Sequence, residues 1–190
     1  MNKNKYFRLL FLSAIAVSGS TWAEDGTIQM NGSLTSTTCS INGLTQTGSP
    51  VATLNFPLGN VPASSFSQAG IAGPVVTNGA NGKVSLTSCP TLSPVTLLLS
   101  PGTAGISSVD LTTSSFKNTF GSGAAANMGA QLINAETGSV LVPSSISGAI
   151  SKTTDALGQA DFYLGARYFS LGTVGTGGYS ANATFSILYQ

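Results

Sequence analysis

Side chains able to do chemistry are few in this sequence, and their spacing matches only fragments of known catalytic motifs. Ser114 and Lys117 have the Ser-x-x-Lys spacing of serine acyl enzymes, in which the serine is the nucleophile. The accompanying motifs Ser-Asp-Asn and Lys-Thr-Gly do not occur in the sequence. Asp155 and Asp161 could form a carboxylate pair, but a glycine lies between them and no base can be identified nearby. We therefore interpret these residues as parts of turns and solvated loops, and we expect no enzyme.

The glycine-rich stretch 121–126 has the composition of a loop that binds a dinucleotide. Such a loop follows a strand and opens a helix, and no strand–helix–strand pattern surrounds this stretch. We interpret it as a turn and expect no cofactor.

The first 23 residues have the order of charged, apolar and small residues that is typical of a secretory signal peptide. Basic residues up to Arg8 precede an apolar run over 9–17, and small residues then lead to Ala23. The apolar run is shorter than the roughly 20 residues that a membrane-spanning helix needs. We therefore predict cleavage after Ala23 and a single exported domain.

Cleavage would also change the charge of the chain. It removes Lys3, Lys5 and Arg8, so the formal net charge falls by three from +1 to −2. The side-chain cations that remain are spread widely along the sequence: Lys83, Lys117, Lys152 and Arg167. No basic patch can be read from them, so we expect no nucleic-acid partner.

Two cysteines, Cys39 and Cys89, are present. Export to an oxidising compartment favours a disulfide between them. The bridge would close a loop of roughly 50 residues, which the chain-entropy model values at about 4 kcal/mol. Metal ligation is the alternative, but it would need partner ligands, and the chain has no histidine and six acidic residues.

Alternating polar and apolar stretches, separated by Gly, Pro and Asn turns, predict an all-β protein. Expected strands include 83–87, 95–99 and 161–169, and residues 128–142 are expected to form a β-hairpin. About seven or eight short strands in one domain favour a Greek-key sandwich of the immunoglobulin-like kind.

Well-formed strands are expected at both ends of the mature chain. The alternation places one set of first-strand residues on a single face: Gly26, Ile28, Met30, Gly32 and Leu34. It does the same for the last strand: Ala181, Ala183, Phe185, Ile187 and Tyr189.

These features together resemble the pilins of the chaperone-usher family, of the type 1 fimbrial kind. Residues 26–32 are similar to the family's N-terminal Gly-x-Ile-x-aliphatic-x-Gly extension, which precedes the first cysteine, here Cys39. Residues 166–168 look like the Ala-Arg-Tyr of its penultimate strand. Tyr189 is penultimate and Gly177 is fourteenth from the end, as in the family's C-terminal signature. The segment 50–74 is longer than the resemblance leads one to expect.

The resemblance implies an incomplete immunoglobulin-like sandwich that a neighbouring subunit completes. It implies a signal peptide (1–23), a donor-strand extension (24–36) and a pilin domain (37–190), with Cys39 paired to Cys89. The residues that fill a neighbour's groove would be Gly26, Ile28, Met30, Gly32 and Leu34. The residues that line the groove and contact a chaperone would be Gly177, Phe185, Ile187, Tyr189 and Gln190.

The implied function is that of a structural fimbrial subunit at the cell surface, reached through the periplasm. Its partners would be neighbouring pilins, a periplasmic chaperone and an outer-membrane usher. Two alternatives stay open at this point. The first strand could be an ordinary strand of a complete sandwich, or the chain could be a minor adaptor or single-domain adhesin that binds a host glycan or protein.

Overall fold

The computed structural model describes most of the chain that follows the predicted signal peptide. The described residues are 26–34, 39–42, 44–45, 52–102, 105 and 108–189. The signal peptide, the boundary between extension and domain at residues 36 and 37, and the terminal Gln190 lie outside them. In this part of the chain no helix is both long and apolar enough to cross a membrane.

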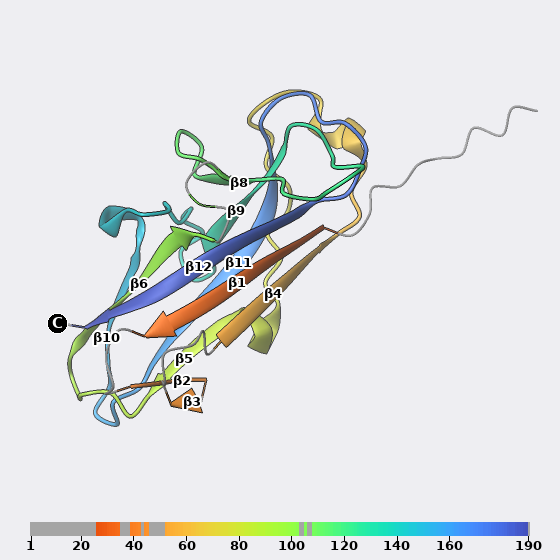
Figure 1. Ribbon diagram of the computed structural model, residues 1–190. Coiled ribbons are helices and arrows are strands. Elements are labelled where there is room, and N and C mark those ends of the chain that lie inside the picture. The colour runs from red at the N-terminus through yellow and green to blue at the C-terminus, as the bar shows by residue number, and fades with distance from the viewer. Residues whose placement is uncertain are drawn as a thin grey trace, which may run out of the picture.

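The described residues form a sandwich of two β-sheets (Figure 1). The first sheet has five strands, in the order β10 (Ile150–Thr153), β6 (Pro94–Pro101), β12 (Ser180–Tyr189), β1 (Gly26–Leu34) and β4 (Ala52–Gly59). The first and last strands of the chain are therefore neighbours near the middle of one sheet.

The second sheet has seven short or medium strands. Their order is β3 (Leu44–Thr45), β2 (Ser40–Ile41), β5 (Lys83–Thr87), β11 (Ala160–Ser170), β9 (Met128–Asn134), β8 (Ser115–Lys117) and β7 (Val109–Asp110). The connections within the described chain include the 3₁₀ helices η1 (Ala63–Phe66), η2 (Gly79–Gly82) and η4 (Ile146–Gly148).

The core lies between the two sheets, and β5, β6 and β12 contribute every second residue to it. Strand β9 is buried on both faces from Met128 to Ile133. On β12, Phe185 and Ile187 are completely buried, and on β11 so is Phe162. Ser186, which lies between the two on β12, is partly exposed, and so are Asp161 and Tyr163 on either side of Phe162. The predicted all-β sandwich and its strand alternation are confirmed.

Two predicted features differ in detail from the structure. The predicted hairpin over 128–142 is present, but its second arm pairs with β9 through one isolated bridge, between Ile133 and Val140, and forms no strand. No strand bounds were predicted within the segment 50–74, and in the structure β4 lies within it and pairs with β1 along nearly its whole length.

Candidate assembly site: the groove between β12 and β4

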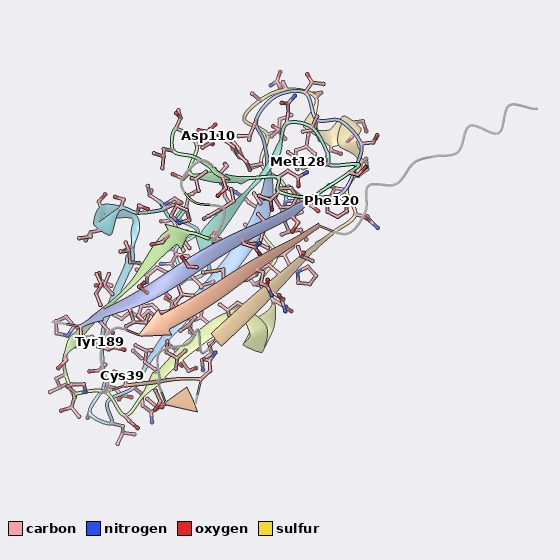
Figure 2. The ribbon with its side chains drawn as sticks, in the orientation of Figure 1. Cys39, Asp110, Phe120, Met128 and Tyr189 are labelled. Atoms are coloured by element: carbon pink, nitrogen blue, oxygen red, sulfur yellow. A yellow bond between two sulfur atoms is a disulfide. The ribbon has the colours of Figure 1, made fainter. Side chains whose placement is uncertain are left out.

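Strand β1 lies between β12 and β4 and separates them completely (Figures 1 and 2). It runs parallel to β12, with Thr27 beside Ser180 and Leu34 beside Ile187. It runs antiparallel to β4, with Ile28 beside Phe56. The gap that the sequence analysis assigned to a neighbour's strand is thus occupied, in this single chain, by the chain's own first strand.

The inward face of β1 is fully enclosed. Ile28 and Met30 have no exposed surface, whereas the side chains of Thr27 and Gln29 between them are exposed. Burial of each apolar side chain contributes roughly 1.5–3 kcal/mol. The expected alternation of this strand therefore holds over the residues whose side chains are described, and β1 seals the core from this side.

The groove has one end at the start of β12, where two tyrosines meet. Tyr168 packs edge-on against Tyr179, with 5.5 Å between ring centroids. The Tyr168 hydroxyl donates a hydrogen bond to the carbonyl oxygen of Gly59 on β4, at 3.1 Å. The Tyr179 hydroxyl donates to the carbonyl oxygen of Phe116, at 2.8 Å. We call this end, defined by Tyr168 and Tyr179, the tyrosine pole.

At the tyrosine pole the Tyr168 hydroxyl occupies the space beside Gly26. A Cβ atom built on Gly26 would overlap the hydroxyl oxygen and lie 2.7 Å from Cζ of the same ring. A cavity of about 10 Å³ lined by Tyr168, Tyr179 and Val174 is no larger than one water molecule. Only glycine fits at this place in the strand without displacing Tyr168.

Burial has a second consequence at this pole. Tyr179 is enclosed on all sides, and the loss of solvent raises the pKa of its phenol well above the usual value, with a further contribution from Tyr168. The hydroxyl therefore stays protonated, and can donate its hydrogen bond to Phe116, at pH values where an exposed tyrosine would begin to ionise.

The other end of the groove lies where β12 ends, and Cys39 and Tyr189 are both found toward this end of the sandwich (Figure 2). Cys39 forms a disulfide with Cys89, with 4.4 Å between the Cα atoms, as predicted. We call this end, defined by the Cys39–Cys89 bridge and Tyr189, the disulfide pole. Burial raises the pKa of Tyr189 to about 12.

The predicted groove-lining residues do not all lie in the groove strand. Phe185 and Ile187 are buried beneath β1, and Tyr189 is half-buried at the end of β12. Gly177 lies before β12 begins, and a Cβ there would overlap the backbone of 123–125. This glycine allows two loops to approach at the tyrosine pole, which is a different place from that of Tyr189.

Charged residues that are far apart in sequence come together around Tyr163: Lys83 and Asp161 on β5 and β11 of the second sheet, Glu136 in the turn after β9, and Lys152 on β10 of the first sheet. Lys83 pairs with Asp161 at 2.8 Å, and Lys152 pairs with Glu136 at 2.8 Å. Both ammonium groups also lie against the ring of Tyr163, at 5.7 and 5.6 Å from its centroid. The cations are widely spaced in the sequence, and only the folded arrangement of β5, β10 and β11 brings Lys83 and Lys152 to the same tyrosine.

The Lys83–Asp161 pair gives a pH-dependent prediction. Burial alone would raise the pKa of Asp161, but hydrogen bonds from Lys83 and Ser85 outweigh it and hold the pKa below its usual value. The hydrogen bond that Lys83 donates to Asp161 raises the pKa of Lys83, although some desolvation acts against it. The pair therefore stabilises the fold above about pH 4, loses that contribution as the pH falls through the lowered pKa of Asp161, and loses it again above about pH 10.5.

Asp161→Asn should lower the free energy of unfolding by less than about 1 kcal/mol at pH 7, because both partners are partly exposed. The difference from the unmodified protein should vanish below about pH 3. Urea unfolding at several pH values measures this. Asp155→Asn, in a neighbouring loop without an ion pair in the described structure, is the control. A deficit that persists at pH 2.5 would contradict the electrostatic explanation.

Nothing in the described residues assembles a catalytic or metal-binding arrangement. Ser114 lies in a turn before β8 and Lys117 is the last residue of that strand. Within the same residues, no group of three or more Cys, Asp and Glu side chains is close enough to hold a metal ion.

Comparison with known proteins matches this geometry to one family. The model of the fimbrial protein family matches residues 28–190. The F17 fimbrial protein of Escherichia coli is 29% identical over 199 aligned residues, covering 96% of this chain and 97% of that protein. Among solved structures, the P pilus rod subunit PapA has a TM-score of 0.54 at 18% identity, covering 80% of this chain and 99% of PapA. An antigen and type I fimbria protein of Burkholderia pseudomallei has a TM-score of 0.42 at 23% identity, covering 87% and 94%. The chain belongs to the fimbrial protein family and is a structural subunit of a cell-surface fimbrium.

Proposed function

We propose that the subunit polymerises by donating residues 24–34 to the groove between β12 and β4 of a neighbouring subunit. The observation that carries this proposal is the place of β1 in the sheet. It is the first strand of the described chain, both of its edges are paired with neighbouring strands, and the side chains of Ile28 and Met30 are completely buried. A segment that fills its own groove so fully has the shape and chemistry to fill the same groove in another copy.

Withdrawal of β1 would leave a groove that cannot persist in water. It would expose the backbone edges of β12 and β4 and uncover the apolar side chains of Phe56, Phe185 and Ile187. Such an edge is prone to aggregation. We therefore propose that a periplasmic chaperone supplies a substitute strand after export, and that an outer-membrane usher exchanges it for the extension of the next subunit. The role is structural and involves no catalytic step.

The energy of the exchange comes from burial and from the strand ladders. Ile28 and Met30 would each contribute roughly 1.5–3 kcal/mol in the neighbour's groove, as they do in their own. Each backbone hydrogen bond on the two edges would add about 0.5–1.5 kcal/mol, net. Summed along the strand, these contributions favour very slow dissociation of neighbouring subunits.

The polarity of the donated strand follows from where the subunit body leaves the groove. In the single chain, β1 ends beside Ile187, and the body resumes at the disulfide pole with Cys39. A neighbour's strand in the same direction would bring two disulfide poles together. A strand antiparallel to β12 brings the donor's disulfide pole to the acceptor's tyrosine pole. Subunits then follow head to tail, and this heterologous contact builds an open fibre.

Deleting residues 24–34 tests the proposal. The variant keeps the acceptor groove and loses the donor strand, so it should accumulate as a soluble chaperone complex and form no fibres. When it is coexpressed with the unmodified subunit, chaperone and usher, it should end growing fibres and shorten them. Electron microscopy and the length distribution of heat-resistant polymers measure both effects.

A subunit with Thr27→Ala and Gln29→Ala, both at exposed positions of β1, is the matched control and should assemble normally. Fibres of normal length from the deletion variant alone would refute the proposal.

A further inference from the structure

Two strongly exposed leucines lie in adjoining turns at the disulfide pole. Leu92 is 71% exposed and Leu157 is 74% exposed. The backbone N–H of Leu92 donates a hydrogen bond to the carbonyl oxygen of Asp155, at 3.4 Å, and that of Cys89 donates to the carbonyl oxygen of Gly158, at 3.1 Å. These bonds join the two turns directly beside the disulfide. We call Leu92 and Leu157 together the leucine tip.

The stability of the subunit does not account for a leucine at position 92. The φ angle of Leu92 is +54°, in the left-handed region that glycine and asparagine adopt more easily than leucine does. This backbone conformation costs energy, and a side chain that stays in water recovers none of it through burial. An exposed apolar residue held in this way is typical of a surface that another molecule covers.

A hollow with apolar walls lies at the opposite end of the sandwich, at the tyrosine pole. Its volume is about 400 Å³, and the residues that line it include Ala124, Ala126, Met128 and Leu171. Met128 also lines the small cavity beside the two tyrosines, and in Figure 2 it lies toward the end of the sandwich away from Tyr189. Pockets of this volume enclose whole small molecules, so the hollow has room for two leucine side chains.

The charges beside the leucine tip and beside the hollow are complementary. Asp155 is exposed, and its Oδ1 accepts hydrogen bonds from the backbone N–H groups of Leu157 and Gln159, both at 2.8 Å. This places a carboxylate at the base of the tip. Lys117 is exposed and lines the hollow. The two charges favour contact between a tip and a hollow and oppose contact between two tips.

We propose that the leucine tip of each subunit packs into this hollow of the next subunit in the fibre. The inference rests on the proposed strand donation, which brings the donor's disulfide pole to the acceptor's tyrosine pole. Five residue steps separate Leu34, at the end of β1, from Cys39, so the connection spans at most about 18 Å. The disulfide pole of the donor is therefore held close to the hollow, and the molecule that covers the tip is a second copy of this chain.

The contact would change the mechanics of the fibre. A donated strand fixes the point at which two subunits are joined, whereas a second contact away from the strand also fixes the angle between their bodies. Fibres should therefore be stiffer with the leucine tip than without it. Loss of the tip should leave the number of fibres unchanged, because the donated strand still holds the subunits together.

Engineered cysteines test the contact in assembled fibres. Leu157→Cys with Ala126→Cys should give a ladder of covalently linked subunits when oxidised fibres are run on a denaturing gel without reductant. Within one subunit the two positions lie at opposite poles, and the ten residues of β12 alone extend over about 30 Å. That distance is far beyond the roughly 7 Å between Cα atoms that a disulfide bridges.

The matched control for this pair is Ile146→Cys with Ala126→Cys. Ile146 is 72% exposed, as the leucines are, but it lies on η4 and outside the leucine tip. We expect no ladder from this control.

A second measurement removes the apolar surface of the tip. Leu92→Asn with Leu157→Asn makes both side chains polar, and asparagine suits the positive φ at position 92. The variant should fold as stably as the unmodified subunit and form fibres in normal number. The persistence length of these fibres in electron micrographs should fall at least twofold. Ile146→Asn is the control and should leave the persistence length unchanged.

A ladder from the Leu157–Ala126 pair, together with flexible fibres from the double asparagine variant, would support the contact. The absence of that ladder, or an equal ladder from the Ile146 pair, would overturn it, and so would an unchanged persistence length. Those results would leave strand donation standing, because the fibres themselves still form. Normal fibres after deletion of 24–34 would instead refute the donation and this contact with it.

Discussion

Ile28→Asp is expected to abolish fibre formation while leaving the subunit able to bind the proposed chaperone. Ile28 is completely buried between Phe56 of β4 and Ala181 of β12. The substitution removes roughly 1.5–3 kcal/mol of apolar burial and adds a penalty of several kcal/mol for enclosing an unpaired carboxylate. No cation lies on the inward face of β1 among its described side chains, so nothing there offsets the charge. The strand should leave the groove, both in its own subunit and in a neighbour.

The measurement is a comparison of two yields, fibres at the cell surface and subunit recovered with the chaperone. Gln29→Asp is the matched control, because it places the same charge one residue away on the exposed face of the same strand. We expect normal fibres from the control. If Ile28→Asp assembled as well as Gln29→Asp, the inward face of β1 would not be what holds subunits together.

Strands with strict alternation were predictable from sequence because a two-residue period is a local property. The first strand, 26–34, and the strand 83–87 were expected at the bounds that the structure shows. The sandwich class follows from the number of such strands and the turns between them. These features depend on residues close together in sequence, which is why one chain was enough to find them.

Strand β4, which forms the side of the groove opposite β12, was not predictable in the same way. β4 contains an apolar alternation at Leu54, Phe56 and Leu58, but Pro57 interrupts it, and proline is rare inside a central strand. β4 tolerates Pro57 because it is an edge strand, a fact that only the sheet order reveals. The apolar alternation at these three residues could have indicated the strand. The many Gly, Ser and Pro residues in 50–74 are more typical of a loop, so they argued against a strand there.

The contact between Gly26 and Tyr168 also depends on residues that are distant in sequence. Gly26 and Tyr168 are separated by most of the chain, and nothing near either residue in sequence indicates that a hydroxyl of one fills the side-chain space of the other. The same is true of the charges on Lys83 and Asp161, which face each other only because β5 and β11 are paired. The local alternation of apolar residues is enough to predict the strands. Which side chains come into contact depends on the order of the strands in the sheets, which the alternation does not determine.

Removal of the disulfide is the second change with a large expected effect. Cys39 and Cys89 are 2% and 8% exposed and join the segment before β2 to the segment after β5. Their bridge spans a sequence separation of 50 residues, so its loss should lower the free energy of unfolding by about 4 kcal/mol. Since domains of this kind are stable by only about 5–15 kcal/mol, much of the margin would be lost.

Replacing both cysteines together, Cys39→Ser with Cys89→Ser, avoids a free thiol that could cross-link subunits. Denaturant unfolding of the purified monomer, with β1 in its own groove, measures the loss, and reduction of the unmodified protein should reproduce it.

The effect on assembly should appear mainly as a low yield of chaperone complex, because the bridge lies at the disulfide pole and outside the groove walls. A change of less than about 1 kcal/mol would mean that strand pairing alone, through Ser40 with Thr87 and Ile41 with Leu86, holds this pole together.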